Sequence, residues 1–486
     1  MKKIISLLLL LSLMLTMLAA CGKEEETKKS NKPTSDSNAP AVEGDIFAER
    51  AKIDDELEEN DFGGRELRVV LHNESEVFIQ EDDRNKGDLI KDAKYERNSR
   101  VEQRFNFTIN PVYVAGINEV SSWVQKNVLS GADEFDLLVN HVLTTGGMVT
   151  KNLFVNWYDV PNVDFSKPWW AASTSNELTY DGKCILAVSD FNYSSVACTY
   201  CMVFNKNLAA SYDLGNLYDT ALSGDWTFET FTNIVKDIWI DSDGTGDKSE
   251  GDFFGMVQPT HSRMNQWLWA FDNPIMTKNE EGVPTISIKT DKINNIVSAI
   301  YDYCYNMNGV MFQVPNETEM FLEKKCIFMI VPLGDLTSEG FRNFEDEYGV
   351  LPLPKWDENQ AEYKTQTYGE HTVSAIPKTV KDLEFVGTCV EALSAESYKT
   401  VIPTLYEIAL KTRYLRDSES KEVLDIVINS RLFDFGYVYD NWQGFGYTLQ
   451  NMMTSGQSNF ESYYSKTYPS ARIHYKKIIK AFDKLS

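Results

Sequence analysis

Histidine is scarce in this chain, with five among 486 residues. They are scattered along the sequence at His72, His141, His261, His371 and His474. This distribution gives no support for a metal centre built from histidines. The chain also lacks Gly-x-Ser-x-Gly, His-Glu-x-x-His, a P-loop and a dinucleotide-binding fingerprint. We therefore expect a protein that is not an enzyme.

Cysteine is the second scarce residue, and the seven present lack the dense spacing of a disulfide scaffold. Cys198 and Cys201 have the Cys-x-x-Cys spacing of redox proteins. They lie in an apolar, strand-like run over residues 195–204 rather than at the start of a helix. We therefore expect buried structural thiols, with a local disulfide as the alternative.

Basic residues are outnumbered, with 47 Lys and Arg against 72 Asp and Glu, and the formal net charge is −25. An acidic surface of this kind disfavours nucleic acid and broad contact with anionic lipid. We expect no nucleic-acid partner, and a monomer. The length of 486 residues favours two lobes over one simple core.

The chain begins with an apolar run over residues 4–17, which is interrupted by two serines and a threonine. Lys2 and Lys3 precede this run, and small residues follow it. A basic start, a short apolar core and small residues before a cut are typical of a secretory signal peptide. The run is too short and ends too abruptly for a membrane-spanning helix.

The signal ends in Leu-Ala-Ala-Cys at Cys21, which resembles the lipobox of bacterial lipoproteins. That resemblance implies a signal peptide over residues 1–20, with Cys21 carrying the lipid. An ordinary signal peptide that ends near a cysteine is the alternative. Residues 21–62 are rich in charged and polar residues, especially up to Pro40, and are predicted to form a disordered tether. Two acyl chains anchor stably, so we expect the protein at the outer face of the bacterial cytoplasmic membrane.

The folded body begins with a regular alternation of predicted elements. Apolar strands are predicted at residues 67–71, 107–113 and 134–139, with helices from about residue 88 and at 120–129 between them. Strand, helix, strand, helix, strand is a parallel α/β pattern. Loops at the carboxyl ends of such strands usually hold ligands. Here those loops offer Asn140 and His141.

Several short sequences occur further along in a characteristic order. They are Val-Phe-Asn-Lys at 203–206, Asp-Trp-Thr-Phe at 225–228, Gly-Val-Leu-Pro-Leu-Pro-Lys at 349–355 and Ser-Ala-Ile-Pro-Lys at 374–378. With the lipobox and the α/β start, they make the chain similar to the extracellular solute-binding lipoproteins of bacterial ABC importers. The resemblance is to the carbohydrate-binding group that includes maltose-binding protein, and it covers about residues 65–486.

That resemblance implies an α/β protein with a two-lobed, periplasmic-binding-protein-like (type II) fold, crossing hinge strands and a mostly helical C-terminal part. It places lobe 1 at 63–189 and 368–412, and lobe 2 at 190–367 and 413–486. It also implies that a carbohydrate, which the chain length suggests is an oligosaccharide, is bound between the lobes and passed to ABC permease subunits.

Sugar recognition needs flat aromatic faces for the ring and carboxylates or amides for the hydroxyls. The resemblance places such residues in a first-lobe loop, an aromatic segment of lobe 2, a turn and a late aromatic position, and at two crossings between the lobes. The implied ligand-binding residues are Asn140, His141, Asp190, Trp267, Trp269, Asp335, Tyr368, Glu370 and Trp442. Each of these aromatic residues could instead pack in the hydrophobic core. We expect that structural role for Trp169, Trp170 and Trp226.

An acidic loop at residues 241–252 has the spacing of a calcium-binding loop. Oxygen-bearing residues occupy positions one, three, five, seven, nine and twelve, with glycine at six: Asp241, Asp243, Thr245, Asp247, Ser249 and Asp252. The final residue is aspartate rather than the usual glutamate, and a strand-like run follows where a helix is usual. Some polysaccharide-binding relatives carry a similar loop in this lobe. A structural calcium ion and a plain solvated turn both remain open.

Two other functions compete with transport. Aspartate and glutamate are so abundant that a glycosidase carboxylate pair could be found anywhere, which leaves no specific signal for catalysis. A surface lipoprotein that binds glycans or peptides without serving a transporter is the main alternative. A hinged pair of lobes favours transport, whereas an open, flat aromatic strip would favour docking.

Overall fold

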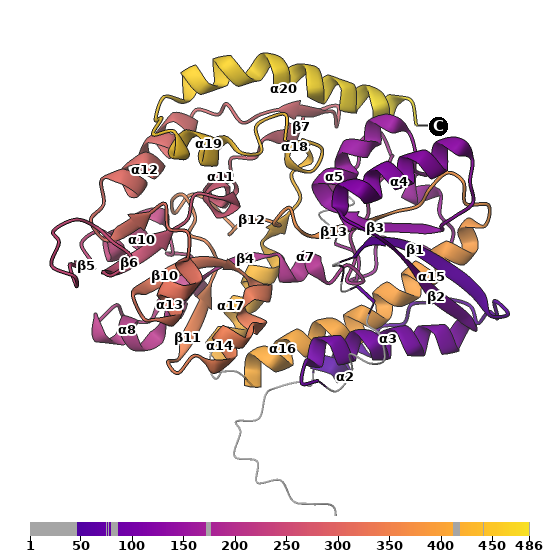
Figure 1. Ribbon diagram of the computed structural model, residues 1–486, viewed down its shortest axis with the longest axis horizontal. Coiled ribbons are helices and arrows are strands. Elements are labelled where there is room, and N and C mark those ends of the chain that lie inside the picture. The colour runs from indigo at the N-terminus through magenta and orange to yellow at the C-terminus, as the bar shows by residue number, and fades with distance from the viewer. Residues whose placement is uncertain are drawn as a thin grey trace, which may run out of the picture. The chain divides into compact units, whose positions relative to one another are not determined.

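The computed structural model describes residues 46–73, 75, 77–78, 86–171, 176–411, 418–440 and 442–485. The predicted signal peptide, Cys21 and residues 21–45 of the predicted tether lie outside these ranges. No helix within the described residues is both long enough and apolar enough to cross a membrane. Figure 1 shows the chain with its elements labelled.

The first sheet has the strand order β13-β3-β1-β2. Its strands are β1 (Arg65–His72), β2 (Phe107–Val114), β3 (Leu137–His141) and β13 (Thr372–Ala375). Strand β1 is parallel to both β2 and β3, as the alternating pattern predicts. The connecting helices are α3 (Leu89–Phe105) and α4 (Ile117–Ser130). The late strand β13 pairs antiparallel with β3, so the chain returns to this sheet after building the second one.

The second sheet has the order β11-β4-β10-β6-β5, with β9 paired to β6. Its strands are β4 (Tyr200–Asn205), β5 (Trp239–Ile240), β6 (Phe253–Gln258), β9 (Val310–Phe312), β10 (Cys326–Pro332) and β11 (Tyr348–Leu351). The helices near it include α8 (Lys206–Ser211), α9 (Leu217–Leu222), α10 (Phe228–Val235), α12 (Ile293–Tyr305), α13 (Glu317–Leu322) and α14 (Glu339–Asn343). Thr227 caps α10 through its hydroxyl, which accepts the Thr230 N–H at 3.2 Å.

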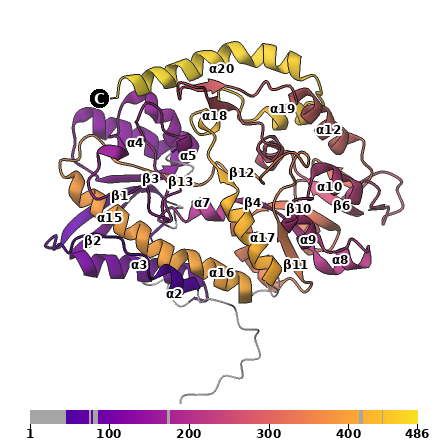
Figure 2. The same cartoon turned by 180° about the vertical axis from the view of Figure 1, so that it is seen from behind.

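Three passages connect the two sheets. The first runs through the short helix α7 (Ser194–Ala197) into β4, and the second runs from β12 (Thr365–Gln366) into β13. The third follows α15 (Leu383–Glu396), a π-helical turn (Ser397–Val401) and α16 (Ile402–Lys411) toward α17 (Ser418–Asn429). Figure 2 shows this last passage running from the side of the first sheet to that of the second. Strand β12 pairs with β14 (Arg431–Leu432), which ties two passages together.

The C-terminal part is helical, as expected, with α18 (Phe435–Val438), α19 (Thr448–Thr454) and α20 (Phe460–Asp483). Helix α20 contacts the 3-10 turn Gly147–Lys151 near the first sheet and α12 near the second. It therefore spans both lobes (Figures 1 and 2). The remaining elements are α2 (Ile46–Arg50), α5 (Val142–Gly146), α11 (Gln266–Ala270), β7 (Met276–Lys278) and β8 (Pro284–Ile286).

The predicted tether ends earlier than expected. Residues 46–62 lie on the first lobe, where the Asp55 carboxylate pairs with Arg104 at 2.6 Å and is buried. The ring of Phe62 packs edge-on against Phe385, with centroids 4.8 Å apart. The polar composition of this stretch concealed three apolar anchors, Ile53, Leu57 and Phe62, that contact the core of the lobe.

The strand expected around Cys198 also starts later. Residues 194–197 form α7, so Cys198 follows a helix and Cys201 lies in β4. All six described cysteines are free thiols, and five are buried. Burial raises the thiol pKa of both Cys198 and Cys201, which keeps them protonated and unreactive. The expected role as structural thiols therefore fits the structure, and the described residues hold no disulfide.

Candidate functional site

The carboxyl end of β3 carries the first part of the site. His141 is the last residue of β3, and its Nδ1 accepts the Thr144 N–H at 3.4 Å. A neutral imidazole then carries its proton on Nε2, which lies 3.6 Å from Glu370 Oε2. Glu370 belongs to the turn that leads into β13, and its side chain is 59% exposed. The hydrogen bond with His141 lowers the pKa of Glu370, so this carboxyl is ionised at neutral pH.

An aromatic face lies beside this pair. The Trp442 indole stacks on the His141 ring, with centroids 6.1 Å apart and planes 15° from parallel. Trp442 is 50% exposed, and its backbone adopts a left-handed conformation with φ +59°. A large aromatic that stays half-exposed and is held flat against a fixed ring offers a rigid stacking surface. Trp442, His141 and Glu370 therefore combine one aromatic face with one exposed carboxylate.

Asn140 plays a different part from the one expected. It is buried, and its amide nitrogen donates to the Ile117 carbonyl and to Thr144 Oγ1, both at 3.3 Å. Its Oδ1 has no hydrogen-bond partner among the described residues. Asn140 therefore supports the loop that follows β3 rather than presenting its amide at the surface.

Tyr368 leads toward the second sheet. Its ring lies 5.2 Å from that of Tyr200 on β4, and the Tyr200 hydroxyl is 3.0 Å from Ser262 Oγ. Next to Ser262, Arg263 pairs with Asp335 at 3.1 Å and also with Glu317. Burial raises the pKa of Asp335, and the Arg263 charge opposes that rise. Four predicted residues, His141, Glu370, Tyr368 and Trp442, thus lie close to one another, and Asp335 lies on the second lobe next to Arg263.

One cavity reaches this group through Glu370, and a second cavity lies beside the first. One of about 320 Å³ is lined by residues that include His72, Lys94, Tyr193, Glu370 and Thr372. The other, about 380 Å³, lies between the start of α3 on the first lobe and Gly334, Thr337 and Arg342 on the second. The two cavities are neighbours, since Lys94, Tyr193 and Ala197 line both of them.

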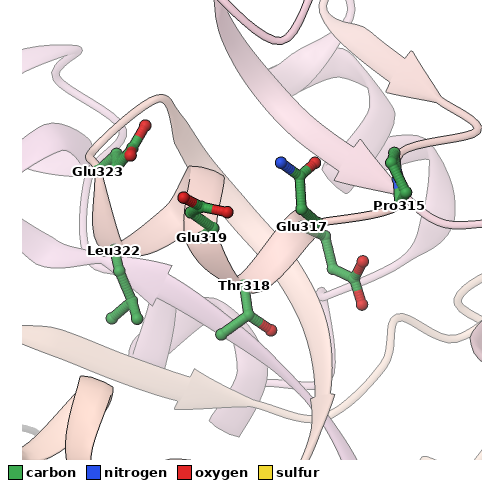
Figure 3. Close-up of a pocket in the computed structure, with 7 residues that line it drawn as sticks. Pro315, Glu317, Thr318, Glu319, Leu322 and Glu323 are labelled. Carbon is green, nitrogen blue, oxygen red and sulfur yellow. The ribbon is translucent and has the colours of Figure 1, made fainter.

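A larger hollow of about 500 Å³ lies elsewhere, over α13 (Figure 3). Its lining is acidic, with Glu317, Glu319 and Glu323, and it contains no aromatic residue. None of the predicted ligand-binding residues lines it. It therefore lacks the aromatic surface that sugar recognition needs, and the space between the lobes is the better candidate.

The aromatic segment of the second lobe needs a correction. Trp267 is 0% exposed and Trp269 is 1% exposed. Their indole N–H groups are used internally, by Gln258 Oε1 at 3.0 Å and by Asp434 Oδ2 at 2.9 Å. Neither ring has a face free for a ligand, so the expected stacking role is wrong for both in this structure. Their position on α11 turns them toward the packed interior.

Asp190 also lies apart from the other predicted residues. It lines a separate cavity of about 350 Å³ together with Arg431 of β14 and the ring of Trp170. Burial raises the pKa of Asp190 to about 7, and Arg431 partly opposes this effect. Asp190 thus lies at the first passage between the lobes and shares this cavity with β14. The structural role expected for Trp169 and Trp170 fits, since both indoles donate to the Glu391 carboxylate, at 2.7 and 2.9 Å.

The acidic loop brings together three of its four predicted carboxylate ligands. Carboxylate oxygens of Asp241, Asp243 and Asp252 lie within 4.8 Å of one another. Hydrogen bonds from Ser249 and Thr245 lower the pKa of Asp243 to about 2. The Asp247 carboxylate is not part of the group. The three clustered acids fit a hard cation such as calcium.

Sequence reasoning missed several residues of the site. Three of them lie near predicted positions but occur in stretches typical of a strand or a loop. They are Tyr193, Tyr200 and Arg263. Lys94 lies in a helix whose buried positions otherwise suggested only packing. A signal was available for Lys94, because a lysine within a buried helical stripe is unusual.

Comparison with known proteins agrees with this architecture. No family model matches the chain, and no curated protein matches its sequence. Among solved structures, it is similar to a cyclo/maltodextrin-binding protein in complex with maltotetraose. The identity is 12%, the TM-score is 0.53, and the match covers 87% of this chain and 98% of that one. An ABC substrate-binding protein from Listeria monocytogenes in complex with cycloalternan matches with 14% identity, a TM-score of 0.47 and the same coverage.

The class of protein follows from the first of these matches together with the sheets and passages described above. The chain has the two-lobed, type II periplasmic-binding-protein-like fold, and the expected fold class is confirmed. Both neighbours are described as binding proteins.

Proposed function

We propose that the protein is a lipid-anchored solute-binding protein that captures a carbohydrate between its lobes and delivers it to the permease of an ABC transporter. The observation that carries this proposal is the group formed by His141, Trp442 and Glu370, in which Glu370 lines a cavity that neighbours a second cavity lined by both lobes. An aromatic face binds the apolar face of a sugar ring, and an ionised carboxylate accepts hydrogen bonds from its hydroxyls.

An oligosaccharide suits the site better than a single sugar. Two neighbouring cavities of about 380 and 320 Å³ lie between the start of α3 and Glu370. Together they offer more room than one sugar ring needs. The structural neighbour crystallised with maltotetraose supports the same size class.

The binding proposal is tested by thermal unfolding of residues 22–486 with a panel of mono- and oligosaccharides. A ligand that binds only the folded state stabilises it by about 2.7 kcal/mol at a hundredfold excess over Kd. We expect a clear rise in Tm for one class of glycan. A flat panel, with a rise for peptides instead, would replace carbohydrate by peptide as the solute.

The anchor is tested separately from binding. In a bacterial host, the Cys21→Ser variant should lose incorporation of labelled fatty acid and leave the membrane fraction. The unchanged chain should label and stay with the membrane. Equal labelling of both would contradict lipid attachment at Cys21 and would leave the binding proposal untouched.

Delivery to a permease is tested in the source cells by deleting the coding sequence and measuring uptake of the glycan that binds. Loss of uptake, restored by the unchanged protein, supports transport. Normal uptake with preserved glycan binding at the surface would instead support a binding lipoprotein that serves no transporter.

We also propose a structural calcium ion in the loop of Asp241, Asp243 and Asp252. The clustering of three carboxylates supports it, because carboxylate oxygens are the preferred ligands of calcium. The ion would fix the loop between β5 and β6 and has no part in binding the solute. We further propose that the protein acts as a monomer.

A further inference from the structure

We propose that the solvent-facing side of α20 is a docking surface for a linear polyanion, a polymer that carries phosphate or carboxylate groups along its length. The surface is separate from the solute site, because none of the described residues Phe460–Asp483 lines either cavity between the lobes. The end of the chain reverses the acidic composition of the rest. Residues 460–485 include two acidic residues and six basic ones, which are Lys466, Arg472, Lys476, Lys477, Lys480 and Lys484. We call these six residues the basic stripe.

The basic stripe lies on the face of α20 that points to solvent. All six residues are exposed, whereas the opposite face of the helix is buried and includes Ala471, Tyr475 and Ile478. Successive residues of an α-helix are turned by about 100°, which places the five basic residues of α20 within an arc of about 140°. Lys484 follows as the C-cap of the helix. From Lys466 to Lys484 the stripe extends about 27 Å along the helix.

The charges of the basic stripe are not used within the part of the chain that the structure describes. None of the six side chains forms an ion pair or a hydrogen bond with another described residue. The exposed cations of α3 behave differently, since Arg100 pairs with Glu396 at 2.8 Å and Arg104 pairs with Asp55 at 2.6 Å. Solubility does not require six unpaired cations, because a net charge of −25 already favours it.

The two acidic residues of α20 do not neutralise the stripe. Glu461 lies at the start of the helix and pairs with Lys289 at 2.6 Å. Asp483 lies at its end and interacts with Tyr180 of the first lobe. Both carboxylates therefore serve contacts with other segments. The exposed face between them carries a continuous positive charge, whose ammonium and guanidinium groups are donors for charge-assisted hydrogen bonds to phosphate or carboxylate.

The position of α20 in the fold favours a partner that lies away from the membrane. Helix α2, the first described element of the body, and α20 lie at opposite sides of the molecule in both views (Figures 1 and 2). The proposed lipid anchor at Cys21 precedes α2 by 25 residues. A body held from the side of α2 presents α20 outward. This step rests on the proposed anchor, which the labelling of the Cys21→Ser variant tests independently.

The surface chemistry of α20 also suits a polymer better than a bilayer. Helices that lie on membranes place an apolar face in the lipid. The apolar face of α20 is already buried in the protein, and its exposed face offers one large apolar side chain, Ile473, which is 59% exposed. The helix thus provides a row of charges with little apolar area. A hydrated polyanion that follows the row is the partner that matches it.

The test measures binding of residues 22–486 to long-chain polyphosphate and to polygalacturonate, with neutral dextran as the uncharged control, over a series of salt concentrations. For single-stranded nucleic acid, each contacting cation contributes about −0.7 to the slope of log K against log salt concentration, through counterion release. The same release from another linear polyanion predicts a slope of about −4 for six contacts. We expect binding of at least one polyanion and none of dextran.

Two fourfold variants connect this binding to α20. The first combines Lys476→Gln, Lys477→Gln, Lys480→Gln and Lys484→Gln. It should bind at least about tenfold more weakly at low salt, with a slope reduced to about −1.4. The control combines Lys52→Gln, Lys126→Gln, Lys236→Gln and Lys381→Gln, all at exposed positions elsewhere, and should keep both the affinity and the slope. Thermal unfolding checks that both variants are folded, and both should bind glycan as the unchanged chain does.

The outcomes are distinct. Polyanion binding that is lost in the α20 variant and kept in the control supports the proposal. No binding of either polyanion at low salt, or equal weakening in both variants, overturns it. Binding to vesicles of anionic lipid in place of the polymers, weakened by Ile473→Ser, assigns the face to a membrane and overturns it. Self-association that disappears in the α20 variant assigns the face to a second copy of the chain, with the same consequence. Loss of glycan binding alone bears only on the proposed function.

Discussion

The Trp442 indole stacks on the His141 imidazole at 6.1 Å, although the two residues are 301 positions apart in the chain. His141 is fixed by the end of β3, whereas Trp442 follows α18 in the helical C-terminal part. The contact therefore forms only in the complete fold. It brings a half-exposed aromatic face next to the exposed carboxylate of Glu370.

The first prediction is that Trp442→Ala weakens binding of the best glycan by about thirtyfold. The loss corresponds to about 2 kcal/mol of aromatic contact area and stacking. Because Trp442 is half-exposed, the midpoint of thermal unfolding should change by only a few degrees. Isothermal titration measures the affinity. Trp442→Phe, which keeps a flat ring, is the control and should retain most of it; unchanged affinity in the alanine variant would remove Trp442 from the site.

The opposite behaviour is expected for Trp267. This side chain is 0% exposed and its ring contacts Phe228, Phe231 and Tyr303. Trp267→Ala should lower the free energy of unfolding by about 3–5 kcal/mol, the usual cost of removing a buried tryptophan. Denaturant unfolding measures this loss. A stable variant that had lost only glycan affinity would return Trp267 to the ligand site.

This pair of tryptophans shows where sequence reasoning succeeds and where it stops. The order of apolar strands and helices is a local property of the sequence, so the parallel first sheet could be predicted. Which face of α11 meets the core is decided by contacts with Asp434 and Gln258. Asp434 is 165 residues from Trp269, and Gln258 is 9 residues from Trp267. Residue type alone therefore could not separate Trp267 from Trp442.

The start of the folded body was misjudged for a related reason. Polar composition indicated a tether up to residue 62, yet single apolar residues in that stretch reach the core. We predict that a chain beginning at Glu66 is less stable than one beginning at Gly44 by about 2 kcal/mol or more, since it loses the packing of Phe62 and its neighbours. Denaturant unfolding compares the two. Phe62→Ala in the longer chain should account for much of the difference, and equal stability would show that residues 46–62 only rest on the surface.

Calcium should raise the unfolding temperature if the acidic loop binds it. A cation held by the carboxylates of Asp241, Asp243 and Asp252 binds the folded state and stabilises it by mass action. We expect a rise in Tm on adding calcium, reversed by a chelator and absent in Asp243→Asn. Asp247→Asn is a matched control, because the Asp247 carboxylate is not one of the three clustered acids. A calcium response that is the same in both variants would place the ion elsewhere.

Buried carboxyls determine the expected dependence of stability on pH. Burial raises the pKa of Glu177, Glu391 and Asp440 to about 7. In the unfolded chain these groups titrate near pH 4. Between about pH 4 and 7 the folded protein therefore binds more protons than the unfolded chain. The free energy of unfolding must then fall as the pH rises through this interval.

Other carboxyls act in the opposite direction at lower pH. Hydrogen bonding to Arg68 lowers the pKa of Asp133, so its contribution is lost once the pH falls below its usual value near 4. Stability should therefore be greatest near pH 4, measured as the midpoint of denaturant unfolding from pH 3 to 8. Glu391→Gln should flatten the slope between pH 5 and 7, because it removes one buried titrating group. The control, Glu384→Gln, changes an exposed residue of the same helix and should leave this slope unchanged. A free energy of unfolding that increases from pH 5 to 7 would show that the buried carboxyls are ionised in the folded protein.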